Sequence, residues 1–203
     1  MLKWQLNVSG LEDALPDRAA LTFVTAPHSA ASMGHIPPRE HSYQWLMDEN
    51  LLGASEAEQA AEHEKWAVTL ELLRGVLKKA AEESQPFDGL LGYSMGTATI
   101  TSLLASLPAA ETRSIRFAIH FCGYPPSQHQ QIFASLKARS PLAIASLHAY
   151  GRKDEIVKPK QSRWHASFYE QTTCEQFEHA GGHDIPRAPD DVARVARFVA
   201  QFA

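Results

Sequence analysis

The chain has 203 residues, a formal net charge of −4 and 44% hydrophobic residues, which is the composition of an ordinary globular protein. This length suffices for one complete hydrophobic core, so we expect a single domain over residues 1–203. The sequence contains no basic run that would indicate a nucleic-acid partner, and no apolar stretch long enough to span a membrane.

The cysteines and the first residues of the chain indicate the cellular compartment in which the protein is expected. Only Cys122 and Cys174 are present, far apart in the sequence, and two cysteines do not make a disulfide framework. The first residues carry neither the apolar segment nor the cleavage signal of a secretory peptide. We therefore expect reduced thiols and a cytoplasmic location.

The N-terminal third predicts a helix, a strand and a long irregular section. Leucines at helical spacing predict a helix over residues 2–15, and Leu21–Ala26 has the composition of a strand. His28 follows this strand where open α/β sheets place ligands, although we favour a plain loop residue. Residues 29–65 lack strong periodicity. We interpret them as a cap-like insertion, with a solvated insertion of no role as the alternative.

From residue 66 onward, helices alternate with apolar strands. After the strand that begins near Phe87, further strands are predicted at Arg116–Cys122, Pro141–Tyr150 and Cys174–Phe177. Helices are predicted at Trp66–Glu83, 128–138, Lys160–Glu170 and Pro189–Ala203. Apolar strands separated by helices are typical of a parallel sheet covered on both faces. The expected fold class is α/β, a three-layer sandwich around a mostly parallel sheet.

The segment Gly92–Gly96 carries the main chemical signal. Its sequence is G-x-S-x-G between a predicted strand and a predicted helix, which is the nucleophile-elbow pattern of α/β-hydrolases. Ser94 would sit on a strained turn, and the two glycines, which lack a Cβ, would let strand and helix approach closely. The N–H of Met95, at the helix start, would bind an oxyanion. The alternative is a glycine-rich turn with a surface serine.

A serine nucleophile needs a base, and the base needs an acid that orients it. In α/β-hydrolases the chain order is serine, acid, histidine. Asp154 lies in the turn after the strand that ends at Tyr150, and His183 follows a double glycine after the last strand. Loops at the same end of parallel strands meet at one sheet edge, so Ser94, Asp154 and His183 are the predicted catalytic set.

Each partner has competitors. Glu155 is next to Asp154 but is expected to face away, and His148 and His179 are alternative bases. His120, within a strand, is expected to be a satisfied core or edge histidine and not a catalytic group. His179 and His183 could also form a metal pair, but the glycines between them do not suit a helical i, i+4 arrangement, so no metal site is expected.

Four segments, FDGLLGYSMG, FCGYPP, GRKDEIV and EHAGGHDIP, resemble the FSH family of serine hydrolases, which are small, nearly lidless α/β-hydrolases. The resemblance extends from residue 2 to about residue 200. It implies Ser94 as nucleophile, Asp154 as acid and His183 as base. It also implies hydrolysis of small acyl esters or thioesters without a cofactor. Family members often carry Gln where this chain has Met95, a mild change because the backbone N–H makes the contact.

The N-terminus departs from the family pattern. The family begins with a strand of the type ILCLHG, whose following loop donates a second N–H to the oxyanion, whereas residues 2–15 resemble the helix after that loop. We therefore expect the first core strand to be missing, as in a fragment or a truncated isoform. The alternative function is a non-catalytic or impaired binding domain. In the enzyme hypothesis, Tyr124, Pro125 and residues 29–65 would wall the acyl pocket.

Overall fold

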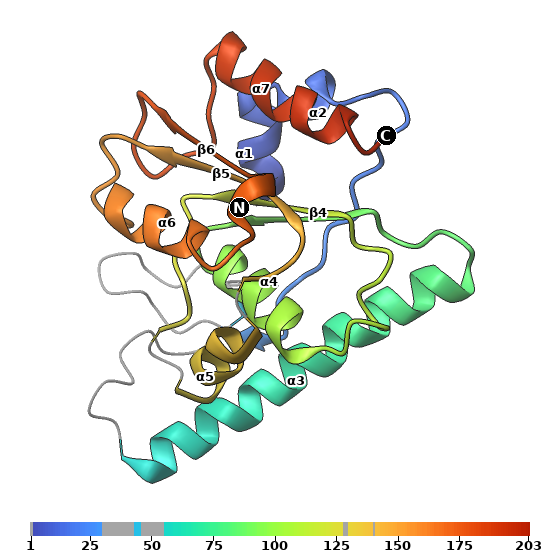
Figure 1. The fold of residues 1–203 in the computed structure, drawn as a ribbon, viewed down its shortest axis with the longest axis vertical. Helices are drawn as coiled ribbons and strands as arrows, with labels where there is room; N and C mark the ends of the chain where they lie inside the picture. Colours follow the sequence, from blue (N-terminus) through green and yellow to red (C-terminus); the bar gives the residue numbers. More distant parts are fainter. Residues whose placement is uncertain (1, 30–42, 46–54, 128–129, 140) are drawn as a thin grey trace.

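The computed structural model describes residues 2–29, 43–45, 55–127, 130–139 and 141–203 (Figure 1). Its centre is a four-stranded sheet in the order β3–β4–β5–β6, and every neighbouring pair is parallel. The strands are β3 (Gly89–Tyr93), β4 (Phe117–Phe121), β5 (Ala145–Gly151) and β6 (Cys174–His179). The predicted parallel sheet is thereby confirmed.

Helices cover both faces of the sheet (Figure 1). One face carries α1, α2 and α7, and the other carries α4, with α3 and α5 packed beyond it and α6 against β5 and β6. The helices are α1 (Leu2–Ser9), α2 (Leu11–Ala14), α3 (Glu56–Glu82), α4 (Met95–Ser106), α5 (Gln130–Arg139), α6 (Pro159–Ala166) and α7 (Pro189–Ala200). This is the predicted three-layer α/β arrangement.

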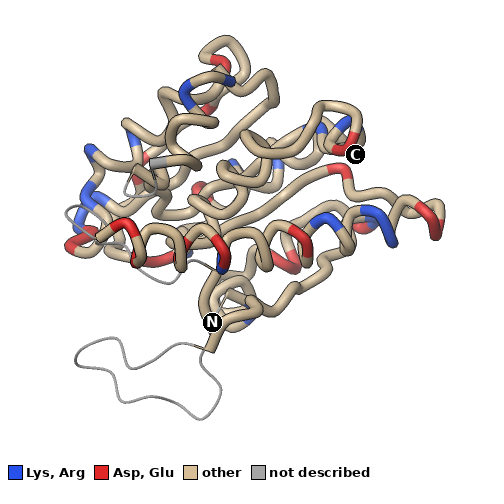
Figure 2. Tube along the Cα trace, turned by 90° about the horizontal axis from the view of Figure 1, so that it is seen from below, with Lys and Arg blue, Asp and Glu red and all other residues tan. Residues whose placement is uncertain are grey.

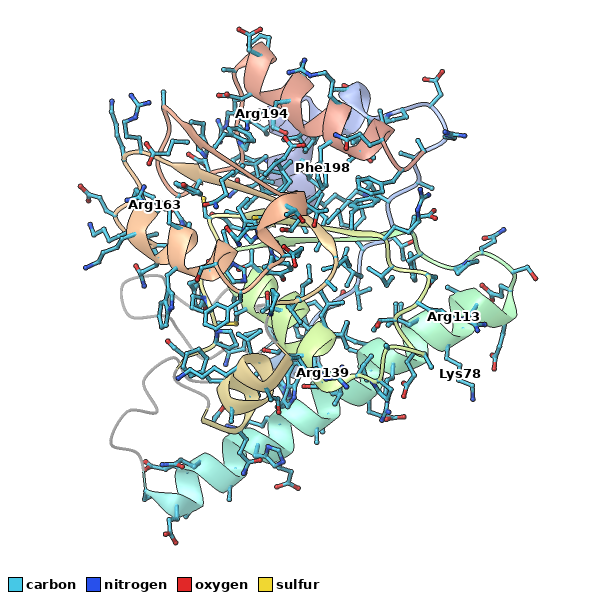
Figure 3. The ribbon with its side chains drawn as sticks, viewed as in Figure 1. Lys78, Arg113, Arg139, Arg163, Arg194 and Phe198 are labelled. Atoms are coloured by element: carbon cyan, nitrogen blue, oxygen red, sulfur yellow. The ribbon has the colours of Figure 1, made fainter. Side chains whose placement is uncertain are left out.

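Apolar side chains fill the space on both sides of the sheet. On the α7 side, Phe121 and Leu147 from the sheet meet Val195 and Phe198. Phe198 points from α7 toward the sheet (Figure 3), where its ring meets the edge of Phe117 at 5.9 Å between centroids. Burial of each such side chain contributes about 1.5–3 kcal/mol, so the two layers hold the sheet between them.

The N-terminal segment differs from the prediction. The helix predicted over residues 2–15 is two helices, because Gly10 between them lies in the left-handed region at φ 69°. The prediction of a strand at Leu21–Ala26 was wrong, because this segment forms no strand. A strand requires a neighbour, and among the described residues β3 pairs only with β4. His28 was expected in a loop but lies in β1 (His28–Ser29), which pairs with β2 (Tyr43–Gln44).

Helix α3 begins earlier than predicted and includes the end of the predicted insertion. Ser55 caps it, accepting a hydrogen bond from the Glu58 N–H while the Glu58 carboxylate accepts one from the Ser55 N–H. This capping box starts a helix without apolar periodicity. Acidic residues dominate the first half of α3 and basic residues follow later (Figure 2), which suits the helix dipole. Residues 30–42 and 46–54 of the predicted insertion lie outside the described residues.

The C-terminal half follows the prediction closely. Helix α6 ends at Ala166, four residues before the predicted limit, and the 3-10 turn Gln171–Thr173 precedes β6. Strand β6 runs on to His179. None of the helices in the described ranges is both long and apolar enough to cross a bilayer.

Candidate active site

Ser94 lies between the end of β3 and the start of α4. Its backbone has φ 52° and ψ −120°, a region that non-glycine residues rarely adopt. Three hydrogen bonds hold the turn. The Ser94 N–H donates to the Phe121 carbonyl at 2.9 Å, and the Ser94 carbonyl accepts from the Thr97 N–H at 2.9 Å and from the Thr97 hydroxyl at 2.7 Å. Strain of this kind persists only where the surrounding structure fixes it. Ser94 therefore has the conformation expected of a nucleophile elbow.

The two glycines of the motif are not equivalent. A Cβ on Gly92 would lie 2.7 Å from the backbone of Gly96, so only glycine permits this approach of strand and helix. A Cβ on Gly96 would meet nothing within 4 Å. The close approach predicted from both glycines is therefore required only at Gly92.

Ser94, His183 and Asp154 lie together, in hydrogen-bond contact. His183 Nε2 is 3.0 Å from Ser94 Oγ, and His183 Nδ1 is 2.8 Å from Asp154 Oδ2. The side chain of Asp154 is fully buried, whereas that of His183 retains 14% of its exposure. These contacts have the order and lengths that a nucleophile, a base and an orienting acid require. The imidazole thus stays partly exposed at the surface while the carboxylate is shielded from water.

The Asp154 carboxylate is held by the turn that contains it. Oδ1 accepts hydrogen bonds from the N–H groups of Ile156 at 2.9 Å and Val157 at 2.8 Å, which leaves Oδ2 for His183. Glu155, the alternative acid, is exposed. The turn therefore presents one carboxylate oxygen, in a fixed direction, to the imidazole.

Three contacts that the sequence did not suggest hold the loop around His183. The Tyr93 hydroxyl donates to the His183 carbonyl at 2.7 Å, and the ring centroids of these residues are 5.1 Å apart. Gln5 of α1 accepts from the Ile185 N–H at 3.1 Å. Gly151, at the end of β5, lets the loop pass so closely that a Cβ there would lie 2.0 Å from the Gly182 carbonyl oxygen. The loop is thus fixed from three elements.

Cys122 also lies beside this loop. It follows β4 with φ 51°, is fully buried, and its thiol is 3.3 Å from the Asp184 carbonyl oxygen, to which it donates. Burial, with the nearby Asp154 carboxylate, raises the pKa of the Cys122 thiol to about 12. Burial likewise raises the pKa of the Tyr93 phenol. Both groups therefore keep their protons at neutral pH and act as donors.

Met95 and Tyr124, the remaining predicted site residues, flank the elbow. Met95 is the first residue of α4, so its N–H belongs to the helix end that carries partial positive charge. Tyr124 lies in the segment after β4, where its N–H donates to the Thr97 hydroxyl at 3.3 Å. Both residues are half-buried. Met95 thus directly follows Ser94 in the chain, and Tyr124 contacts the first turn of α4.

The other histidines lie apart from this contact. His179 is buried, and its Nδ1 accepts from the Gly181 N–H at 3.2 Å. His120 and His148 are buried and stack with centroids 4.6 Å apart beside His165. The expectation of a satisfied histidine at position 120 was wrong, because neither of its ring nitrogens has a hydrogen-bond partner among the described residues. Burial lowers the pKa of all four. Among the described residues, His183 is the only candidate base in hydrogen-bond contact with Ser94.

The fold is that of the α/β-hydrolases. The structure resembles that of a Bacillus cereus carboxylesterase, with a TM-score of 0.62 and 16% sequence identity. The matched region covers 98% of this chain and 83% of the carboxylesterase. Against Arabidopsis thaliana SOBER1 the TM-score is 0.65 at 12% identity, over 97% of this chain and 93% of that one. At these identities the similarity shows the shared fold.

Sequence similarity identifies the family. The model of the serine hydrolase (FSH1) family matches residues 4–195, and the chain belongs to this family. It is 30% identical over 211 residues to the human esterase OVCA2, covering 97% of this chain and 89% of the relative. It is also 30% identical to a Caenorhabditis elegans esterase, covering 89% of this chain and 79% of the relative. The resemblance inferred from the four sequence segments is confirmed.

Proposed function

We propose that the chain hydrolyses small carboxylic esters or thioesters through an acyl-enzyme on Ser94. The observation that carries the proposal is the pair of contacts at His183, 3.0 Å to the serine hydroxyl and 2.8 Å to the Asp154 carboxylate. Membership of a serine hydrolase family supports it. We further propose that residues 1–203 form one catalytic domain, in which Tyr124 lines the acyl pocket.

The chemistry follows from these positions. Ser94 Oγ attacks the acyl carbonyl while His183 Nε2 takes its proton, and Asp154 stabilises the resulting imidazolium. The Met95 N–H donates to the oxyanion that forms. His183 returns the proton to the departing alcohol or thiol, which leaves an acyl ester on Ser94. A water molecule, activated by the same imidazole, then releases the acid. No metal or cofactor takes part in these steps.

Labelling with a fluorophosphonate probe tests the nucleophile. We expect the purified chain to take up the probe at Ser94 and to hydrolyse p-nitrophenyl acyl esters, and Ser94→Ala to do neither. Ser114→Ala, in the loop before β4, is the matched control and should keep both activities. A folded chain that takes up no probe and hydrolyses no ester would instead support the alternative, a non-catalytic binding domain.

The leaving group of the substrate, an alcohol or a thiol, is tested by a separate kinetic measurement. Comparing kcat/KM for an oxygen ester and a thioester of the same acyl group, over a series of chain lengths, separates esterase from thioesterase activity.

We also propose a cytoplasmic location, which suits the free thiols of Cys122 and Cys174. Fractionation of cells that produce the tagged protein tests it.

A further inference from the structure

Three possible metal-ligand atoms meet directly behind the proposed catalytic contact. The Cys122 sulfur, a carboxylate oxygen of Asp154 and a ring nitrogen of His183 all lie within 4.8 Å of one another. Cys122 and Asp154 are buried, and His183 is partly buried. Among the described residues, this is the one group of three or more such side chains at that spacing. The atoms come from the ends of β4, β5 and β6, so the parallel sheet assembles them.

The donor set suits zinc. Thiolate, imidazole and carboxylate are the ligands that Zn²⁺ takes in proteins, at about 2.0–2.3 Å. Tetrahedral geometry at those bond lengths separates ligand atoms by roughly 3.3–3.8 Å. On metal binding, the longer distances between the ligand atoms would therefore shorten. The 2.8 Å distance between His183 Nδ1 and Asp154 Oδ2 would lengthen. Each of these changes in distance is about 1.5 Å at most.

Cys122 is a well-placed ligand. Its φ of 51° is a strained conformation for a non-glycine residue, and it holds the thiol under the His183 loop. A metal ion deprotonates a thiol that it binds. A Zn²⁺ ion bound to one thiolate, one carboxylate and one neutral imidazole forms a group without net charge. Burial of a neutral group costs far less than burial of an isolated ion.

We propose that Cys122, Asp154 and His183 form an inhibitory site for Zn²⁺ and related thiophilic divalent ions. This inference rests on the proposed role of His183 as the base. Bonds form from the metal to Cys122 Sγ, Asp154 Oδ2 and His183 Nδ1. The thiol proton passes to solvent, and the imidazole proton moves from Nδ1 to Nε2. An Nε2 that carries a proton cannot accept one from Ser94, so hydrolysis stops while the protein stays folded.

Inhibition is the first measurement. We expect Zn²⁺ to abolish ester hydrolysis and a chelator to restore it. Each variant's activity is expressed relative to its own metal-free rate, because Cys122 also contacts the His183 loop. Cys122→Ser should raise the half-inhibiting Zn²⁺ concentration at least about tenfold, the smallest loss usual for a disturbed metal site. Cys174→Ser, the matched control on β6, should leave it unchanged. Equal inhibition of both variants would overturn the proposal.

Metal binding without catalysis is the second measurement. In Ser94→Ala, which has no nucleophile, Cd²⁺ should still produce the ultraviolet charge-transfer band of a cadmium–thiolate bond, and Cys122→Ser should remove it. This readout separates the two proposals. An inactive chain that shows the band would contradict the hydrolase but keep the metal site, whereas an active chain without the band would contradict the metal site alone.

Discussion

At the scale of single residues, the Asp154 carboxylate decides which nitrogen of His183 carries the proton. Its two oxygens have separate tasks, because Oδ1 accepts two backbone N–H groups and Oδ2 faces Nδ1. A carboxylate at that place requires Nδ1 to be the donor. Nε2 is then the acceptor and is available for the serine proton. The turn after β5 thus sets the chemistry of a ring that belongs to another loop.

Asp154→Asn tests this assignment. Asparagine keeps an acceptor for the two backbone N–H groups, so its NH₂ would face Nδ1 and force the proton onto Nε2. We expect kcat to fall about 10⁴-fold, as in other triads with this change, with little change in KM. Thermal unfolding should show a folded variant. Glu155→Gln, the exposed neighbour, is the matched control, and an Asp154→Asn enzyme with near-normal kcat would contradict the assignment.

Tyr93→Phe tests whether the hydrogen bond to the His183 loop supports the proposed base. The hydroxyl donates to the His183 carbonyl, and one neutral hydrogen bond contributes about 1 kcal/mol. We expect kcat to fall about fivefold to tenfold without a change in KM, because the ring remains and only the anchoring of the loop weakens. A rise in KM with an unchanged kcat would contradict this role and assign Tyr93 to the substrate pocket.

At the scale of elements, the end of β5 and the loop before His183 must pass each other at backbone contact. Gly151→Ala would place a Cβ 2.0 Å from the Gly182 carbonyl oxygen, and backbone on both sides leaves little room to yield. We expect a loss of several kcal/mol in stability, or a displaced His183 loop with activity reduced at least tenfold, within the range usual for severe steric changes. Denaturant unfolding and kcat separate these outcomes.

Gly75→Ala is the control for that change. Gly75 lies in α3, and a Cβ there would meet nothing within 4 Å. Alanine in a helix is favoured over glycine by roughly 0.5–1 kcal/mol, so this variant should be slightly more stable with full activity. Destabilisation by both variants to the same extent would show that the close approach at Gly151 is not what matters.

The sequence predicted the elements whose signal is local. Strands β4 and β5 are apolar runs ended by turn residues, and the chain order of Ser94, Asp154 and His183 is readable without a structure. The strand at Leu21–Ala26 was predicted from composition alone, but a strand forms only beside a partner. Contacts such as Tyr93 with His183 join residues 90 positions apart, and no local pattern encodes them.

At the scale of the whole molecule, the layer between β4, β5 and the elbow helix contains a buried polar cluster. The Thr101 hydroxyl contacts His165 Nε2 at 2.6 Å and the Tyr169 hydroxyl at 2.7 Å. Both ring nitrogens of His120 and of His148 are buried without a hydrogen-bond partner among the described residues. Unpaired buried polar groups reduce stability, so this layer is less stable than an apolar one. It lies directly under α4, which begins at Met95, next to Ser94.

This cluster should make the fold sensitive to acid. Burial lowers the pKa of His120 and His148 well below the ordinary value near 6.5, and that of His165 to about 3. As the pH falls below about 6.5, the unfolded chain binds protons at these residues and the folded chain does not. Stability therefore falls as the pH falls, by about 1.4 kcal/mol per pH unit for each histidine, and is unaffected by them above about pH 7.5.

His148→Leu tests the effect through a difference between two pH values. Leucine cannot titrate, so the loss of unfolding free energy between about pH 7 and pH 5 should shrink by about 2 kcal/mol relative to the unaltered chain. The absolute stability changes as well, because a buried side chain is replaced, and only the difference between the two pH values is diagnostic. Leu147→Val, buried on the same strand, should change the stability without changing its pH dependence. An unchanged pH dependence in His148→Leu would mean that His148 is protonated inside the folded protein, and that the layer beneath Ser94 tolerates a buried charge.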